Sequence, residues 1–303
     1  MIARLLARLG PAARHPGEAM MSNTSGTGRE FQERPVLPAN FFERPAVARL
    51  QDYLDHGRDN YLPDRQLAHQ LLAAAPWVRD SVRINRTHGA RVLDYFSAGL
   101  GIDQVVDLGC GLPHEHNNRR STTFRRMVYV DNDPVVEAHA RMVLAEPDGA
   151  DTVLADLTDV PALAASSPFA ELDHHKPVGV LLHDVLPWLD DRTARTTLRM
   201  LHGHLPPRSV LSLTHATGDF AHPDQVRRLV ETFEHAGMLF RPRSPAAIED
   251  LLGPWEPLDG HGLVVTADWE PPRALVAPPP LLHAQRGLSH AYATLVTTGD
   301  RTP

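Results

Sequence analysis

A turn between two apolar segments holds residues whose types and spacing could do chemistry. The string "VVDLGCGLP" at residues 105–113 contains Asp107, Gly109, Cys110 and Gly111. Glycines in such a turn let the backbone approach a bound nucleotide, because no Cβ stands in the way. The turn nevertheless lacks the third glycine of a dinucleotide-binding fingerprint, and the chain contains no P-loop string.

The charge of Asp107 distinguishes between the nucleotides that this turn could bind. A carboxylate here would repel the phosphates of NAD or ATP. S-adenosylmethionine carries an ammonium and a sulfonium and no phosphate, so the same carboxylate would attract it. The sequence therefore predicts S-adenosylmethionine as the cofactor, with Asp107, Gly109, Cys110 and Gly111 around its amino-acid portion.

Two further apolar segments end in aspartate, at Asp131 and at Asp156. The carboxyl ends of parallel strands meet at one edge of a sheet, where ligands bind. We expect Asp131 to accept hydrogen bonds from the ribose hydroxyls, with Asn132 beside it. Asp156 is expected to bond the adenine amine, and Leu157 to pack near the adenine. The string "DND" at 131–133 also fits a metal-binding motif, but that alternative leaves the glycine turn without a role, so we predict no metal site.

The next two strand ends carry candidates for catalysis, namely His183, Asp184 and His215. Methyl transfer to oxygen or nitrogen needs a proton to be removed, and histidine titrates near neutrality. We also expect His183 to contact the cofactor. An alternative stays open, in which either histidine only hydrogen-bonds the cofactor or caps the following helix.

Composition limits the class of protein and its partners. The 303 residues carry a formal net charge of −7, which argues against nucleic acid as the main partner. The single cysteine excludes an internal disulfide and the cluster motif of radical enzymes. No apolar segment approaches the roughly 20 residues needed to cross a bilayer. We therefore expect a cytoplasmic protein with a small-molecule partner and no nucleic-acid or membrane partner, with a homodimer as one option.

The segments that must position these residues alternate between two patterns. Short runs rich in valine and leucine predict strands, and helical patterns such as "DPVVEAHARMVLAE" and "RTARTTLRMLHGHL" lie between them. Two more strand patterns, "HGLVVTADW" and "HAYATLVTT", stand near the end of the chain. Continuous apolar strands that alternate with helices indicate an α/β fold with a parallel sheet buried on both faces.

Three regions follow from these patterns. Residues 1–40 are rich in arginine and then in polar residues, and we expect a disordered or mis-started leader. Residues 41–100 are expected to form a helical cover that excludes water from the cofactor, and residues 101–303 the cofactor-binding domain. Four residues of the cover are candidates to contact the cofactor: Tyr53, Asn60, Tyr61 and Arg86.

The chain resembles the actinobacterial S-adenosyl methyltransferase family, long catalogued as a domain of unknown function. The resemblance covers residues 45–220 and rests on "RPAVARLQDYLDHGRDNYLPDR", "INR", "DLGCGLP", "VYVDNDPVVEAHAR", "ADL" and "LSLTHATGDF". It implies a Rossmann-like class I methyltransferase fold, with a mostly parallel sheet of seven strands, an antiparallel last strand and an N-terminal helical cover. The chain departs from the family pattern at "HEH" (114–116) and at "HDVLPWLDD" (183–191).

Together these observations predict an S-adenosylmethionine-dependent methyltransferase that acts on a small molecule in bacterial specialised metabolism. Two alternatives belong to other classes. The protein could bind the cofactor as a sensor or accessory subunit without transferring a methyl group. It could also use the same cofactor for a reaction other than methylation, such as a cyclisation.

Overall fold

The computed structural model describes residues 37–114, 124–145, 149–258, 262–271 and 288–300. The predicted leader therefore lies almost wholly outside the described residues. Described residues from Leu37 onward belong to one compact unit, which contains both the predicted cover and the predicted cofactor-binding domain.

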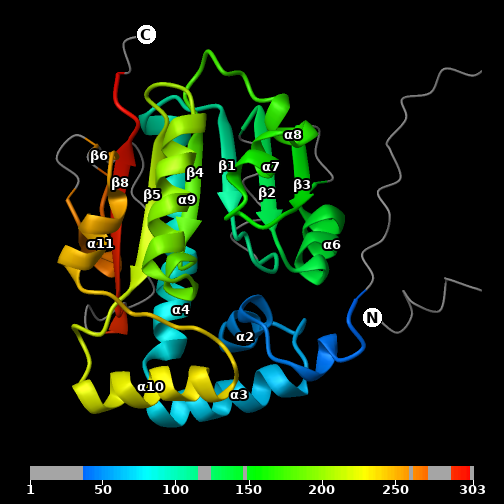
Figure 1. Ribbon diagram of the computed structural model, residues 1–303, viewed down its shortest axis with the longest axis vertical. Helices are drawn as coiled ribbons and strands as arrows, with labels where there is room; N and C mark the ends of the chain where they lie inside the picture. The colour runs from blue at the N-terminus through cyan, green and yellow to red at the C-terminus, as the bar shows by residue number, and fades with distance from the viewer. Residues whose placement is uncertain (1–36, 115–123, 146–148, 259–261, 272–287, 301–303) are drawn as a thin grey trace, which may run out of the picture. The chain divides into compact units, whose positions relative to one another are not determined.

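A mixed sheet of eight strands occupies the centre of the described unit (Figure 1). The strand order is β3-β2-β1-β4-β5-β8-β6, and β7 pairs with β8. Strands β1 to β5 are mutually parallel, whereas β8 is antiparallel to β5. In chain order the strands are β1 (Gln104–Leu108), β2 (Arg126–Asp131), β3 (Ala150–Leu154), β4 (Gly179–His183), β5 (Val210–Ala216), β6 (Glu256–Pro257), β7 (Val264–Val265) and β8 (Ala291–Thr297).

This topology confirms the predicted Rossmann-like class and corrects one detail. We expected seven strands, and eight are found among the described residues, because β6 and β7 pair with separate stretches of β8. The pattern "HGLVVTADW" yields only the two residues of β7, after which the chain turns into the 3-10 helix η5 (Thr266–Asp268). The order of the strands reverses between β1 and β4, so ligands are expected beyond the carboxyl ends of these two strands.

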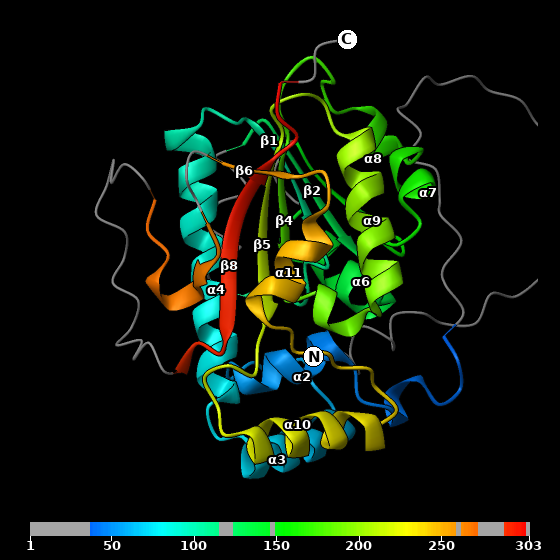
Figure 2. The same ribbon diagram turned by 60° about the vertical axis from the view of Figure 1, so that its left-hand side comes forward.

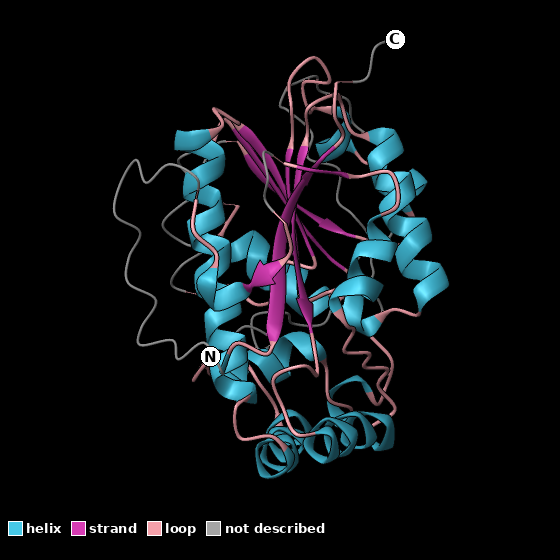
Figure 3. Cartoon of the chain, turned by 90° about the vertical axis from the view of Figure 1, so that its left-hand side faces the viewer, coloured by secondary structure: helices cyan, strands magenta, loops and turns pink. Residues whose placement is uncertain are grey.

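Helices cover both faces of the sheet (Figures 2 and 3). Successive strand residues point to opposite faces, so Val106 packs on the side of α7, α9 and α11, while Val105 packs on the side of α4. The main helices are α2 (Val47–Leu54), α3 (Leu62–Ala74), α4 (Val78–Asp94), α6 (Pro134–Val143), α7 (Val160–Ala164), α8 (Ser167–Ala170), α9 (Asp191–His204), α10 (Pro223–His235) and α11 (Pro245–Leu252). Short helical turns are η1 (Phe41–Glu43), η2 (Tyr95–Gly99) and η4 (Leu186–Trp188).

The helical cover lies at the end of the sheet where β4 and β5 finish (Figure 1). Leu50 and Leu54 of α2 and Leu71 of α3 share a buried apolar cluster with Leu229 and Phe233 of α10. Helix α10 follows β5, so the cover draws on a segment beyond the predicted 41–100 region. None of the described helices combines the length and apolarity that a membrane crossing requires.

Candidate functional site

The glycine turn after β1 takes a conformation that favours glycine. Gly109 and Gly111 have φ angles of 71° and 65°, in the left-handed region. The amides of Gly109 and Cys110 donate to the carbonyl oxygen of Val130, at 2.8 and 3.1 Å. A Cβ on Gly109 would lie 2.6 Å from Cγ2 of Val185, whereas one on Gly111 would meet open space. Gly109 therefore lets the turn approach the loop after β4, and Gly111 leaves its own side open.

Asp131 fastens the glycine turn to the end of β2. Its Oδ2 accepts a hydrogen bond from the amide of Gly111 at 3.0 Å, and its Oδ1 accepts one from the amide of Asp133 at 2.9 Å. Each carboxylate oxygen can accept a further hydrogen bond. Burial raises the pKa of Asp131 to about 6, although these amide bonds favour the ionised form.

Asp107 lies on β1 opposite Tyr129 of β2 and Leu181 of β4. Burial, and then the nearby charge of Asp131, raise the pKa of Asp107 to about 7. Asp107 lines a cavity with Gly109, Cys110, Gly111, Arg86, His114 and His183, among others, and we call it the cofactor cavity. It encloses about 680 Å³ including its mouth. Glu115 and His116, the rest of the "HEH" string, lie outside the described residues.

His183 ends β4 and points toward α4. Its Nε2 lies 2.8 Å from Oγ of Ser212, and a Cβ on Gly89 would lie 3.3 Å from its Nδ1. Burial lowers the pKa of His183 to about 3, so the ring is neutral near pH 7. The ring therefore borders the cofactor cavity as a neutral hydrogen-bonding group.

Asp184 holds an unusual backbone conformation at the next position. Its φ of 57° is uncommon for a residue other than glycine, and such residues cluster at functional sites. The amide of Asp184 donates to both the carbonyl oxygen and Oγ1 of Thr214, at 3.1 and 2.9 Å. Oδ2 accepts a hydrogen bond from Nε2 of Gln51 at 3.0 Å, and burial raises the pKa of Asp184 to about 7.

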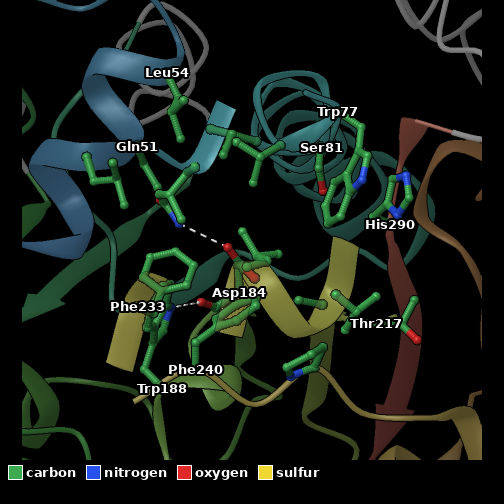
Figure 4. A pocket seen from close by; sticks show the side chains of 18 residues that line it. Gln51, Leu54, Trp77, Ser81, Asp184, Trp188, Thr217, Phe233, Phe240 and His290 are labelled. Atoms are coloured by element: carbon green, nitrogen blue, oxygen red, sulfur yellow. Dashed lines mark hydrogen bonds between the residues drawn. The ribbon is translucent and has the colours of Figure 1, made fainter. Parts of the chain in front are cut away.

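A second cavity lies beneath the helical cover (Figure 4). Its walls include Leu54, Trp77, Trp188, Phe233 and Phe240, together with Gln51 and Asp184, and we call it the cover cavity. It encloses about 580 Å³ including its mouth. Gln51 lines both cavities, so the two sites adjoin at the Gln51–Asp184 hydrogen bond.

His215 is placed differently from the other two catalytic candidates. Its Nδ1 lies 2.8 Å from the carbonyl oxygen of Ala216, and its Nε2 lies 2.8 Å from Nη1 of Arg243, which can only donate. Burial lowers the pKa of His215 to about 4. Both ring nitrogens are thus engaged, and His215 stands outside the two cavities as the described residues form them.

The residues predicted to hold ribose and adenine lie at the ends of β2 and β3. Asn132 is exposed in the bend that follows β2. Asp156 is exposed, and its Oδ1 accepts hydrogen bonds from the amide and the hydroxyl of Thr158 at 2.9 and 2.8 Å. Leu157 is partly buried against the apolar cluster that includes α7 and α9.

Arg86 and Tyr53, two of the candidates from the cover, contact different neighbours. Nη1 of Arg86 donates to Oδ2 of Asp55 at 2.9 Å, and Arg86 lines the cofactor cavity. The hydroxyl of Tyr53 lies 2.8 Å from Nε2 of His69. Of these two, the structure brings Arg86 to the predicted site.

The other two cover candidates stabilise the cover itself. Nδ2 of Asn60 donates to Oδ2 of Asp52 at 2.8 Å and to the carbonyl oxygen of Gly57 at 3.1 Å. Tyr61 caps α3, and its ring centroid lies 5.4 Å from the guanidinium carbon of Arg49. Their bonds organise the connection between α2 and α3.

Sequence reasoning missed Gln51. Positions 51 and 54 lie on one face of a helix, since residues three apart are neighbours there. Leu54 is buried, so a polar residue stands on the apolar face of α2. This polar residue on an apolar helix face was the feature of the sequence that could have pointed to Gln51. Among the described residues no group of histidine, cysteine or acidic side chains is arranged to hold a metal ion.

Comparisons with known proteins agree on one family. The model of the family described as S-adenosyl methyltransferase matches residues 41–293. A crystal structure of a DUF574 family protein from Streptomyces avermitilis MA-4680 is similar at 25% identity and a TM-score of 0.76, covering 84% of this chain and 98% of that one. A candidate methyltransferase from Thermobifida fusca YX is similar at 27% identity and a TM-score of 0.75, covering 86% and 98%. The comparison with curated proteins finds no match.

Proposed function

Because the chain belongs to the S-adenosyl methyltransferase family, we propose that it transfers a methyl group to a small molecule bound in the cover cavity. The family confirms the predicted cofactor, S-adenosylmethionine, which supplies an activated methyl group. One observation carries the proposal: Gln51 lines both cavities, and the adjacent residues His183 and Asp184 line one cavity each. A donor in the first cavity and an acceptor in the second would meet at this junction.

The groups around the cofactor cavity suit the charges of the cofactor. We propose that Asp107 faces its ammonium group and that Arg86 pairs with its carboxylate, while Gly109, Cys110 and Gly111 pass close to its amino-acid portion. Two half-buried carboxyls beside the turn, Asp107 and Asp131, would repel a phosphate. These side chains therefore fit an adenosine that carries a positive charge better than they fit a nucleotide with phosphates.

The remaining cofactor contacts follow the ends of β2 and β3. Asp131 keeps lone pairs for the ribose hydroxyls beyond the two backbone amides that it already binds. Asn132 lies beside this position. The exposed carboxylate of Asp156 is proposed to accept from the adenine amine, and Leu157 to pack against the ring.

Of the three catalytic candidates, we propose that Asp184 takes the proton. It lines the cover cavity, and its raised pKa makes it a better base than an ordinary carboxylate. His183 is proposed to orient the cofactor as a neutral ring. The engaged nitrogens of His215 support a structural role for that residue.

The mostly apolar and aromatic lining of the cover cavity, with a few polar groups, supports a small acceptor, since small-molecule sites are lined in this way. A role in bacterial specialised metabolism stays a prediction. The cytoplasmic location, the homodimer and the absence of a nucleic-acid partner stay predictions as well.

Calorimetry and a methyl-transfer assay test the proposal together. S-adenosylhomocysteine should bind with one site per chain, and NAD and ATP should not bind. Asp131→Ala should weaken binding by about 1–3 kcal/mol, the loss expected for hydrogen bonds to a charged group. Asp250→Ala, which removes an exposed carboxylate on α11, is the matched control and should bind as the parent does. Tight NAD binding without a response to S-adenosylhomocysteine would refute the proposal, and cofactor binding without methylation of any acceptor would favour a sensor.

A further inference from the structure

We propose that the acceptor is a flat, uncharged phenol that binds in the cover cavity with its hydroxyl against the carboxylate of Asp184. This inference rests on the proposed methyl transfer and names the substrate class for the same site. It follows from the aromatic walls of the cavity, from the charges that line it, and from the position of one carboxylate between the walls.

The cover cavity has aromatic side chains on two sides. On one side Trp188, Phe233 and Phe240 contact one another, with ring centroids 4.7 to 5.1 Å apart. On another side the ring of Trp77 stacks on His290, with centroids 3.5 Å apart and planes 12° from parallel. Figure 4 shows Asp184 between these two groups. Aromatic faces of this kind favour a flat aromatic ligand, through stacked or edge-to-face contacts.

The charges of the cavity exclude an anionic acceptor. Within the described part of the chain, no arginine or lysine lines it, and Asp184 is its acidic residue. A carboxylate or phosphate on the acceptor would be buried beside Asp184 without a cation to pair with it, which is costly in an apolar site. The other polar groups that line the cavity include the amide of Gln51, which bonds Asp184, and the hydroxyls of Ser81 and Thr217, and these suit an uncharged polar substituent.

The hydrogen bonds of Asp184 leave one carboxylate oxygen for the acceptor. Gln51 donates to Oδ2, and Thr214 holds the backbone amide, so the carboxyl is fixed in position. Among the described residues, no donor is bonded to Oδ1. A hydroxyl that donates to Oδ1 would lie beside Asp184, which bonds Gln51 at the junction of the two cavities and follows His183 in the chain.

The basicity of Asp184 separates phenols from other hydroxyl compounds. Burial raises the pKa of Asp184 to about 7, which is within about three units of a phenol such as tyrosine, with a pKa near 10. Aliphatic alcohols are far weaker acids, so a carboxylate of this strength would assist them little. A phenol is therefore the hydroxyl compound that this group can activate.

The reaction balances without a further reagent. The phenolic oxygen attacks the methyl carbon, and the O–CH₃ bond forms as the S–CH₃ bond breaks. The sulfur keeps the electron pair, so the by-product is S-adenosylhomocysteine. The phenolic proton passes to Asp184, which then releases it to solvent.

Three probes of one shape test the substrate class: 2-naphthol, 2-naphthylamine and 2-naphthoic acid. Calorimetry with protein saturated with S-adenosylhomocysteine should show 2-naphthol binding, and 2-naphthoic acid at least about tenfold weaker. Mass spectrometry should find the methyl ether of 2-naphthol as the main product. Faster methylation of the amine or the acid would overturn the assignment, and so would the failure of all three probes to bind. Failure of S-adenosylhomocysteine to bind would instead refute the proposed function.

Two variants test separately whether Asp184 takes the proton and whether the acceptor binds in the cover cavity. Asp184→Asn should reduce methylation of 2-naphthol by about 10²–10⁴-fold and leave the affinity for S-adenosylhomocysteine unchanged. Asp250→Asn is the control and should keep both. Val78→Trp, which fills the cover cavity from α4, should weaken 2-naphthol binding without changing cofactor affinity. Full turnover in Asp184→Asn, or unchanged 2-naphthol affinity in Val78→Trp, would contradict the inference.

Discussion

The pH dependence of cofactor binding should report the protonation of Asp107. Burial and the charge of Asp131 raise the pKa of Asp107 to about 7 in the free protein. In the proposed complex this carboxylate faces the ammonium group of the ligand, which favours its ionised form. Lowering the pH from 8 to 5 should therefore weaken the binding of S-adenosylhomocysteine, because Asp107 must lose a proton before it can pair.

The size of the effect follows from that pKa. Relative to its value at high pH, Kd should rise about twofold at pH 7, about tenfold at pH 6 and about a hundredfold at pH 5 if Asp107 acts alone. A hundredfold change is about 2.7 kcal/mol of binding free energy. Asp131, whose pKa is raised to about 6, should steepen the fall below pH 6.

Calorimetry in two buffers of different ionisation enthalpy measures the protons released on binding. Near pH 6 the parent protein should release about 0.9 proton from Asp107 for each S-adenosylhomocysteine bound, and Asp131 should add to this release. 5′-Methylthioadenosine lacks the amino-acid portion and should not release the proton that belongs to Asp107. Asp107→Asn should bind more weakly at pH 8 and lose the same proton release. The reasoning is refuted if the parent releases no proton at pH 6, or if Asp107→Asn keeps the full pH dependence.

Three further predictions concern stability and catalysis. Because burial raises the pKa of Asp184 to about 7, the ionised carboxylate destabilises the folded protein at pH 8. Asp184→Asn should therefore melt about 5 °C higher than the parent at pH 8. This difference in melting temperature should shrink toward pH 5, where the parent carboxyl is protonated. Backbone strain alone should lower the free energy of unfolding of Gly111→Ala by about 1–3 kcal/mol. Gly109→Ala should lose more, because its new Cβ also clashes with Val185. Urea denaturation measures both losses. His215→Gln should melt earlier but keep the pH profile of turnover, and a loss of more than about 10²-fold in a folded variant would restore His215 as a base.

The sequence was sufficient for the class of fold and for the edge of the sheet at which the cofactor cavity lies. Asp107 and Asp131 lie at or next to the ends of apolar strands. Apolar strands that alternate with helices can assemble in few ways, and a parallel sheet covered by helices on both faces is the usual one. The local pattern also placed His183 and Asp184 at the carboxyl end of β4.

The parts that sequence could not give depend on contacts between distant segments. Gln51 reaches Asp184 only because α2 docks over the end of β4, and no local pattern encodes that docking. His215 looked like a free base at a strand end, but Arg243, from the segment after α10, occupies its Nε2. The cover cavity likewise needs α10 to pack on α3, which joins residues far apart in the chain.

A crystal structure of the protein with S-adenosylhomocysteine and 2-naphthol tests the central claim most directly. The account predicts the homocysteine ammonium beside Asp107 and the ribose hydroxyls on Asp131. It predicts the naphthol in the cover cavity, with its hydroxyl within hydrogen-bond distance of Asp184 and facing the sulfur atom. A nucleoside bound outside the cofactor cavity, or a naphthol bound away from Asp184 and the sulfur atom, would contradict it.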